Sequence, residues 1–322
     1  MSIKKINFKP KIIVVCGPTG SGKTGLANYL CQKFDGEIIN VDSRQVYREM
    51  NIGTGKDLDQ IKVPIHLVDI INPDEKYNVG QFKIDAEEVI RDIISRGKVP
   101  FIVGGTGLYV DALTENFSFP SISNLKSKKL KINIKSKNLE ELVNILGKLD
   151  PEALSVVDLK NRRRVERAIE VCLTTGIPFT KQRNRGERNY EVLKLSPAVS
   201  LDREKLYEKI NKRVDEMVDE GLEKEVRSLV EKYGWESEAM TGIGYREWRL
   251  RHSIPNFQFP ISNKTSSSKI QNKQIINDVI EEIKKNTRNY AKRQMTWFKR
   301  DKEINYVDLK KAEKLVRCFL IN

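Results

Sequence analysis

Short apolar runs alternate with amphipathic stretches over the first two-thirds of the chain. Runs rich in β-branched residues, bounded by Gly, Pro or Asp, predict buried strands at residues 11–16, 37–41, 66–71, 99–103 and 190–195. Apolar residues recur at helical spacing in 23–34 and 81–96. Strands that alternate with helices predict an α/β fold: an open parallel sheet with helices on both faces.

The segment between the fourth and fifth predicted strands differs in composition. Residues 126–137 are dense in lysine, and 139–172 combine a helical pattern with many arginines. We therefore expect residues 118–188 to form an inserted, mainly helical domain. Residues 1–117 and 189–322 would together form the catalytic core.

Helices dominate the predicted C-terminal part of the core. Asp202 caps a long predicted helix that Gly221 interrupts, and a last helix is expected over 274–300. Residues 251–273 contain two prolines and a serine run with little periodicity. They are predicted to form an extended surface loop.

A phosphate-binding motif follows the first predicted strand. The residues are Gly17, Pro18, Thr19, Gly20, Ser21, Gly22, Lys23 and Thr24, which match G-x-x-x-x-G-K-[ST] between a strand and a helix. Glycines let backbone N–H groups turn toward phosphate oxygens, and the helix N-terminus adds positive potential. Lys23 would meet the phosphate charge and Thr24 would ligate Mg²⁺. A tight glycine turn alone does not explain the Lys-Thr pair, so the chain is predicted to form a P-loop, as P-loop NTPases do.

Asp42 ends the second predicted strand, on the ligand-binding edge of an open sheet. At that place a carboxylate can bind a metal through water, accept a proton from a nucleophile, or cap a helix. These three roles stay open on the residues alone. The chain has no guanine-reading N-K-x-D motif, which disfavours a GTPase.

The charge of the chain favours a polyanion partner. Fifty-eight Lys and Arg against 44 Asp and Glu give a formal net charge of +14, although a general lysine bias would do the same. Arg163, Arg164 and Arg167 share one face of a predicted helix and would form a phosphate-binding strip. The alternative is a solvated face paired to Glu166 and Glu170.

Cysteine and histidine usage excludes two classes of small protein. The four cysteines are scattered, without a C-x-x-C pair, and the chain has two histidines. This pattern excludes a zinc ribbon and argues against a disulfide framework. We expect a reduced, cytoplasmic protein without a membrane segment.

Taken together and in order, eight motifs resemble one family. They are the P-loop, DSRQVY (42–47), IGTGK (52–56), HLVD (66–69), VGGTGLY (103–109), RAIEV (167–171), GYR (244–246) and AKRQMTW (291–297). From residue 12 to residue 298 the chain is similar to tRNA dimethylallyltransferases, also called tRNA isopentenyltransferases, of the bacterial type. The order of the motifs carries this resemblance more than any single motif does.

The resemblance implies a reaction and its partners. A dimethylallyl group would pass from dimethylallyl diphosphate to N6 of the adenosine next to the tRNA anticodon, at position 37, releasing diphosphate. The partners would be the tRNA anticodon stem-loop and dimethylallyl diphosphate, with Mg²⁺ as cofactor and a monomeric enzyme. Asp42 would be the general base, Lys23 and Thr24 would stabilise the leaving group, and Thr106 would lie near the adenosine. The residues expected at the tRNA are Asp42, Ser43, Arg44, Gln45, Thr106, Arg163, Arg164, Arg167, Thr241, Arg246 and Arg293.

Departures from the family pattern leave two local questions. Lys160-Asn161 stands where many relatives have Asn-Asp, which puts a local cap or RNA contact in doubt. Thr241 stands where some relatives carry an arginine near the diphosphate, so Arg246 or Arg293 would have to serve.

Three rival functions remain. An adenylate isopentenyltransferase would act on free AMP, ADP or ATP, and would not need the basic insert. A P-loop nucleotide kinase would consume ATP. A non-catalytic RNA-binding protein would have no reason to keep Lys23, Thr24 and Asp42 together.

Overall fold

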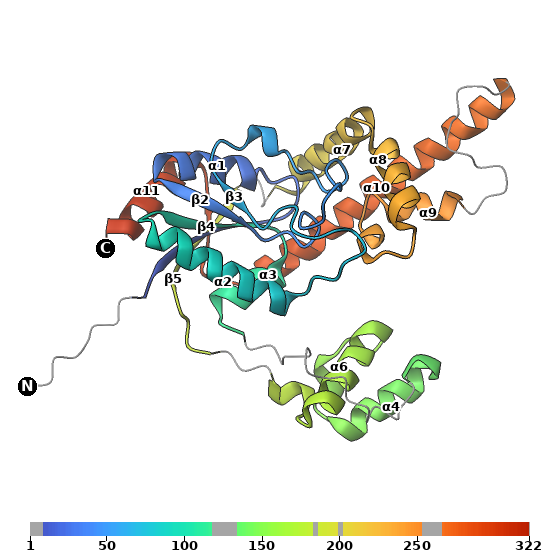
Figure 1. Ribbon diagram of the computed structural model, residues 1–322, viewed down its shortest axis with the longest axis horizontal. Coiled ribbons are helices and arrows are strands. Elements are labelled where there is room, and N and C mark those ends of the chain that lie inside the picture. The colour runs from blue at the N-terminus through green and yellow to red at the C-terminus, as the bar shows by residue number, and fades with distance from the viewer. Residues whose placement is uncertain (1–8, 118–133, 183–185, 199–201, 253–265, 322) are drawn as a thin grey trace, which may run out of the picture. The chain divides into compact units, whose positions relative to one another are not determined.

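The computed structural model describes residues 9–117, 134–182, 186–198, 202–252 and 266–321. The chain divides into two compact units (Figure 1). One comprises Met1–Val110 with Asn189–Asn322, and the other comprises Asp111–Arg188.

The first unit is built on a parallel sheet of six strands, which confirms the predicted fold class. The strands are β1 (Lys11–Cys16), β2 (Gly36–Asn40), β3 (Ile65–His66), β4 (Val99–Gly104), β5 (Glu191–Pro197) and β6 (Ile304–Val307). Their order across the sheet is β3-β2-β4-β1-β5-β6. The register aligns Val15 of β1 with Val103 of β4, and Asn40 of β2 with the same Val103. The carboxyl ends of β2, β4 and β1 therefore lie side by side.

Helices cover both faces of the sheet. On one face, α1 (Lys23–Lys33) and α11 (Leu309–Ile321) pack through Leu30 and Val316 on buried strand residues. On the other face, α2 (Val79–Ser95) buries Phe82, which stacks on Tyr109 of α3 (Gly107–Thr114). Figure 1 shows α1 and α2 on opposite sides of the strands. Burial on both faces explains the near-continuous apolar runs of β1 and β4.

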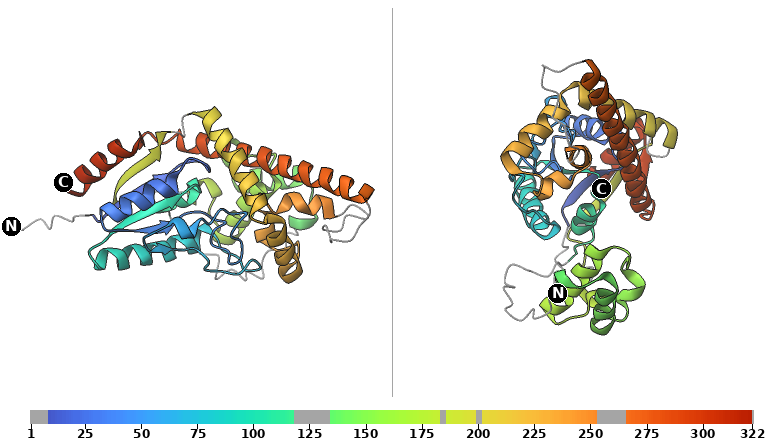
Figure 2. Two further views of the ribbon diagram at one scale, coloured as in Figure 1. Left: turned by 90° about the horizontal axis from the view of Figure 1, so that it is seen from above. Right: turned by 90° about the vertical axis from the view of Figure 1, so that its right-hand side faces the viewer.

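Four further helices form a second core beyond the carboxyl ends of the strands. They are α7 (Arg203–Asp219), α8 (Leu222–Tyr233), α9 (Arg246–His252) and α10 (Ser266–Phe298), and α7 lies alongside α10 in both views of Figure 2. Asp202 caps α7, and Gly221 separates α7 from α8 at φ 102°, as the sequence predicts. The fully buried Trp248 and Tyr245 lie in this second core.

Three expectations for this unit are wrong. The strand expected over 66–71 has only two residues, because Leu67 and Asp69 adopt positive φ angles of 60° and 55° that break the pairing. Helix α10 begins at Ser266, before the expected 274, since extending an existing helix is easier than starting one. The prediction also missed β6 and α11. The remainder of the expected loop, 253–265, lies outside the described residues.

The second unit is mainly helical, in line with the predicted insertion. It contains α4 (Leu139–Leu149), α5 (Ala153–Val156) and α6 (Arg162–Thr175). Leu142 and Leu146 of α4 pack on Val165 and Ile169 of α6. Asn138 and Glu141 form a capping box at the start of α4, which fixes where that helix begins. The lysine-rich residues 126–133 lie outside the described part of the chain.

Short 3-10 turns complete the described elements: η1 (Leu58–Gln60), η2 (Ile134–Ser136), η3 (Phe179–Gln182) and η5 (Glu238–Thr241). No helix of the described ranges is long and apolar enough to cross a bilayer.

Candidate active site

Three loops meet at the carboxyl edge formed by β2, β4 and β1. Val41 N–H donates to Val103 O at 2.8 Å, and Thr106 N–H donates to Val41 O at 3.2 Å, so the loops after β2 and β4 are joined directly. A Cβ at Gly104 would lie 2.7 Å from the Val41 backbone, so only glycine permits this approach. The third loop is the P-loop, which follows β1.

The P-loop has the turn that its sequence predicts. Gly20 and Gly22 adopt φ angles of 77° and 81°, a region that favours glycine, and α1 starts at Lys23. Lys23 Nζ donates to Pro18 O at 3.4 Å. Ser21 Oγ is buried and has no partner among the described residues. The loop therefore carries a polar group and a cation that its own chain does not fully satisfy.

The environment of Lys23 weakens its hold on a proton. Burial lowers the pKa of Lys23 to about 8; the Asp42 carboxylate opposes this shift, and the Arg213 guanidinium adds to it. The carboxylate and the guanidinium therefore both lie close enough to influence the Lys23 ammonium. A bound anion would restore the charged form of Lys23, because it supplies the missing negative charge.

Asp42 is held by one of its two carboxylate oxygens. Arg44 N–H donates to Asp42 Oδ1 at 2.9 Å, and Asn40 Oδ1 accepts from Asp42 N–H at 3.3 Å. Oδ2 has no hydrogen bond to a described residue. The backbone thus orients the carboxylate and leaves one oxygen able to take a proton.

Thr106 lies beside Asp42. Its Oγ1 accepts a hydrogen bond from Ser43 N–H at 3.2 Å. Tyr290 of α10 lies near both residues: burial and the Asp42 carboxylate raise the pKa of Tyr290, and the Thr106 side chain opposes them. Asp42, Thr106 and Tyr290 are therefore neighbours. Nothing in the residue type of Tyr290 alone indicates this place.

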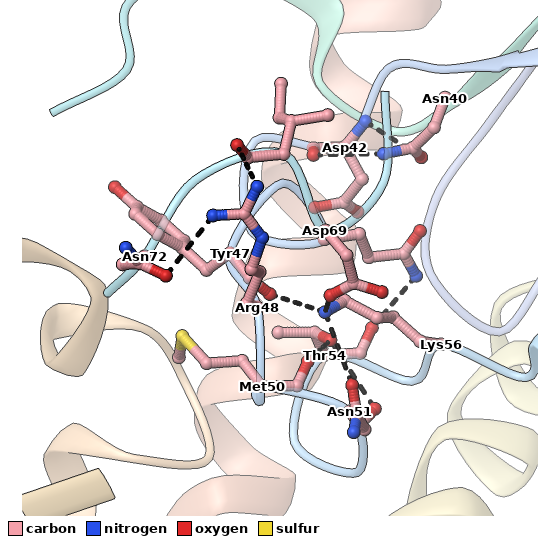
Figure 3. A network of polar contacts seen from close by, with 12 residues as sticks. Asn40, Asp42, Tyr47, Arg48, Met50, Asn51, Thr54, Lys56, Asp69 and Asn72 are labelled. Carbon is pink, nitrogen blue, oxygen red and sulfur yellow. Dashed lines mark hydrogen bonds and ion pairs between the residues drawn. The ribbon is translucent and has the colours of Figure 1, made fainter. Parts of the chain in front are cut away.

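A buried lysine organises the loop after Asp42. Figure 3 shows Lys56 among Tyr47, Asn51 and Asp69. Its Nζ donates to Tyr47 O at 2.5 Å, to Asn51 Oδ1 at 3.4 Å and to Asp69 Oδ1 at 2.5 Å. Burial lowers the pKa of Lys56 and Asp69 opposes the shift. Lys56 fastens residues 47–56 to the segment whose positive φ angles end β3.

Glu225 of α8 holds the same loop from the other side. Its carboxylate accepts from the backbone N–H groups of Asn51, Ile52 and Gly53 at 2.8–3.0 Å, and from the Tyr245 hydroxyl at 2.7 Å. Charge-assisted bonds to consecutive amides fix a loop more firmly than neutral bonds do. The sequence places Lys56 in the IGTGK motif without indicating its role, and it does not single out Glu225, which lies in an ordinary charged helix pattern.

A cleft of about 550 Å³ opens beside the P-loop. Its walls include Gly20 and Gly22 of the P-loop, Lys56, and Arg213 of α7. Arg213 donates to Gly55 O at 3.0 Å and pairs with Asp57. This arginine, also missed from the sequence, supplies a cation next to the phosphate loop.

The three residues after Asp42 have internal partners. Ser43 binds Thr106 through its backbone, and Arg44 donates to Glu238 O and Thr241 Oγ1, each at 3.3 Å. Gln45 Nε2 donates to Thr54 O and Gly55 O. The Gln45 amide donors are therefore engaged in holding the loop, and its Oε1 is the part left to meet a base.

The cations expected to replace a family arginine at Thr241 have different surroundings. Arg246 pairs with Glu247 at 3.0 Å. Arg293 is exposed and lies over the Tyr290 ring at 5.7 Å from its centre. Arg213 is the guanidinium that acts on Lys23.

In the second unit, α6 carries the predicted arginine strip. Arg163, Arg164 and Arg167 are all exposed, and Arg167 lies 3.7 Å from Glu170. Arg162 instead pairs with Glu166. Asn161 caps α6 by accepting from Arg164 N–H, so the Lys160-Asn161 departure leaves the cap intact. The side chains of Arg163 and Arg164 are free of described carboxylates.

The described residues hold no group of three or more His, Cys, Asp or Glu that could bind a metal. A hydroxyl such as that of Thr24, exposed in the first turn of α1, is a hard oxygen donor of the kind Mg²⁺ accepts. Because Mg²⁺ commonly takes its other ligands from phosphates and water, the donor set fits a magnesium ion that arrives with a diphosphate.

Comparisons with known proteins identify the family of the chain. The family model described as IPP transferase matches residues 45–301. The chain belongs to this family. It is 39% identical to the tRNA dimethylallyltransferase of Finegoldia magna over 94% of the chain and 92% of that protein. It is 40% identical to that of Staphylococcus aureus (strain JH9), with 93% of each covered.

Solved structures of the family share the fold. The full-length tRNA isopentenylpyrophosphate transferase of Bacillus halodurans aligns with a TM-score of 0.64 at 33% identity, over 97% of this chain and 96% of that one. A eukaryotic dimethylallyltransferase acting on tRNA aligns with a TM-score of 0.74 at 29% identity, over 89% and 69%.

The lowered pKa of Lys23 predicts a pH-dependent affinity for diphosphates. Above pH 8 most Lys23 is neutral and must take up a proton when an anion binds. The probe is methyl diphosphate, whose last pKa we take as about 6 by analogy with phosphate monoesters, so its charge stays constant above pH 8. Its affinity should therefore fall about tenfold per pH unit above pH 8. Titration calorimetry between pH 7 and 10 measures this affinity. Lys23→Met should bind weakly with a flat profile, and a flat wild-type profile would contradict the assignment.

Proposed function

We propose that this IPP transferase family member transfers a dimethylallyl group from dimethylallyl diphosphate to N6 of the adenosine next to the anticodon of tRNA. The observation that carries the proposal is the meeting of a P-loop with Asp42 and Thr106 at one sheet edge. The Asp42 carboxylate acts to raise the pKa of Lys23, and Thr106 is hydrogen-bonded to the residue after Asp42. A leaving-group site and a proton acceptor thus lie in one place.

Asp42 would be the base that removes the proton of the attacking amine. The lone pair of an adenine N6 amine is delocalised into the ring, so the amine attacks poorly unless its proton is removed as the C–N bond forms. General-base assistance of this kind contributes about 10²–10⁴-fold. Asp42 Oδ1 is fixed by Arg44 N–H, and Oδ2 is the oxygen that accepts the proton.

The P-loop would stabilise the negative charge of the diphosphate leaving group. Cleavage of the allylic C–O bond leaves negative charge on diphosphate, which Lys23, the loop amides and Arg213 offset without reorganising. Thr24 would hold Mg²⁺, which adds positive charge at the diphosphate when bound. No phosphoanhydride bond is broken, so the loop is used here without nucleotide hydrolysis.

The second unit would hold the tRNA. Arg163, Arg164 and Arg167 offer exposed guanidinium groups to phosphates, while Ser43, Arg44 and Gln45 lie next to Asp42, where a flipped adenine would have to enter. Thr241, Arg246 and Arg293 complete the proposed tRNA-binding set. The monomeric state and the cytoplasmic location stay predictions.

The molecule that accepts the dimethylallyl group distinguishes the proposal from its rivals. We expect label from labelled dimethylallyl diphosphate to appear on unmodified tRNA and not on AMP when both are offered. Label on AMP alone would instead identify an adenylate isopentenyltransferase. Label on neither acceptor, together with ATP turnover, would identify a kinase.

The arginine strip of α6 predicts a change in the salt dependence of tRNA binding. Replacing Arg163 and Arg164 by Gln removes two exposed cations without breaking a described ion pair. The affinity should fall, and the slope of log affinity against log salt should decrease by up to about 2. The matched control is the Lys310→Gln, Lys314→Gln pair, two exposed cations of α11. An unchanged slope in the Arg variant would exclude the strip from the interface.

A further inference from the structure

One side chain of α10 bridges the phosphate loop and the loop after β4. Gln294 Oε1 accepts from Thr19 N–H at 3.0 Å, and Gln294 Nε2 donates to Gly105 O at 2.9 Å. Gln294 is 6% exposed. A single planar amide therefore connects two loops that are far apart in sequence, and both halves of that amide are used.

The surrounding backbone is shaped around this amide. A Cβ at Gly105 would lie 2.2 Å from Gln294 Nε2 and 3.2 Å from Gly17 O. Glycine at 105 is thus required for the bridge to form. Gln has both a donor and an acceptor at this reach at any pH, whereas an ionised Glu lacks the donor and Lys lacks the acceptor.

Three side chains on one face of α10 lie against the glycine-rich turn at residues 105–107. Tyr290, Gln294 and Trp297 are four and three residues apart, so they share one helix face. Tyr290 meets Thr106, Gln294 meets Gly105, and the Trp297 ring occupies the place of a Cβ on Gly107. Gly105, Thr106 and Gly107 are each matched by one side chain of the helix.

The bridge completes a chain of contacts between the two chemical groups of the proposed reaction. It runs from Thr19 through Gln294 to Gly105, and Thr106 then accepts from the backbone of Ser43, which follows Asp42. Each step is one hydrogen bond or one peptide unit. Gln294 therefore adds a side-chain link between the diphosphate loop and the carboxylate edge, beyond the pairing of β1 with β4.

We infer that Gln294 is a positioning residue that holds the P-loop and the Thr106–Asp42 edge at the separation needed for transfer. The inference rests on the proposed function. Gln294 contacts the loops and acts through them. A misplacement of about 1 Å can cost about 10²-fold in rate, so its loss should lower kcat far more than it changes substrate binding.

Two variants test this role. Gln294→Met keeps the volume and removes both hydrogen bonds, and should lower kcat about 100-fold while KM for each substrate changes less than threefold. Gln294→Glu keeps the acceptor for Thr19 but donates to Gly105 O only when protonated. Burial favours the protonated acid, so the ratio of its kcat to that of wild type should rise at least tenfold from pH 8.5 to pH 6. The same ratio for Gln294→Met should stay flat.

The control is Gln274→Met, an exposed glutamine of the same helix, which should behave as wild type. The inference is overturned if wild type is active and Gln294→Met keeps more than a third of its kcat. It is also overturned if the loss of kcat in Gln294→Met equals the loss of folded protein and the Gln294→Glu ratio is flat with pH. Absence of transfer by wild type to either tRNA or AMP is a separate outcome, which overturns the proposed function and this role with it.

Discussion

The site depends on one constraint of the sheet: β2, β4 and β1 are parallel neighbours, so their carboxyl ends open at one edge. Asp42, Thr106 and the P-loop come from three segments, and this strand order alone makes them adjacent. The backbone bonds between Val41, Val103 and Thr106 then fix the first two loops to within hydrogen-bond tolerance. Strand order therefore brings the three segments together, and the side chains act within that arrangement.

Loops without regular structure need other partners for their backbone groups, because buried unpaired amides and carbonyls are costly. In this protein those partners are side chains from the second core and its loops. Glu225 of α8 binds three successive amides, Lys56 binds a carbonyl and a carboxylate, and Gln294 of α10 binds one amide and one carbonyl. The helices beyond the sheet edge thus hold the loops of the site in addition to forming the second core.

The sequence predicts the elements whose information is local. The P-loop, the strand before it, Asp42 at a strand end and the Gly221 break between α7 and α8 all follow from residue types at fixed spacing, and the structure has them. It does not predict the shortened β3, because the residue types of Leu67 and Asp69 do not by themselves indicate positive φ angles. Nor does it predict Arg213, Glu225 or Gln294 at the site, since each looks like an ordinary polar residue of an amphipathic helix until the fold brings it to a loop. The resemblance to a family located the AKRQMTW motif without saying which of its side chains faces inward.

The central claim is that Asp42 takes the proton of the attacking amine beside a phosphate loop used as a leaving-group clamp. Asp42→Asn retains the acceptor for Arg44 N–H and removes the basic oxygen, so it tests this claim most directly. Single-turnover transfer from labelled dimethylallyl diphosphate to tRNA should slow by about 10²–10⁴-fold, with tRNA affinity within a few-fold of wild type. Asp74→Asn, an exposed carboxylate, is the control. Near-normal transfer by Asp42→Asn would contradict the account and assign the proton to another group.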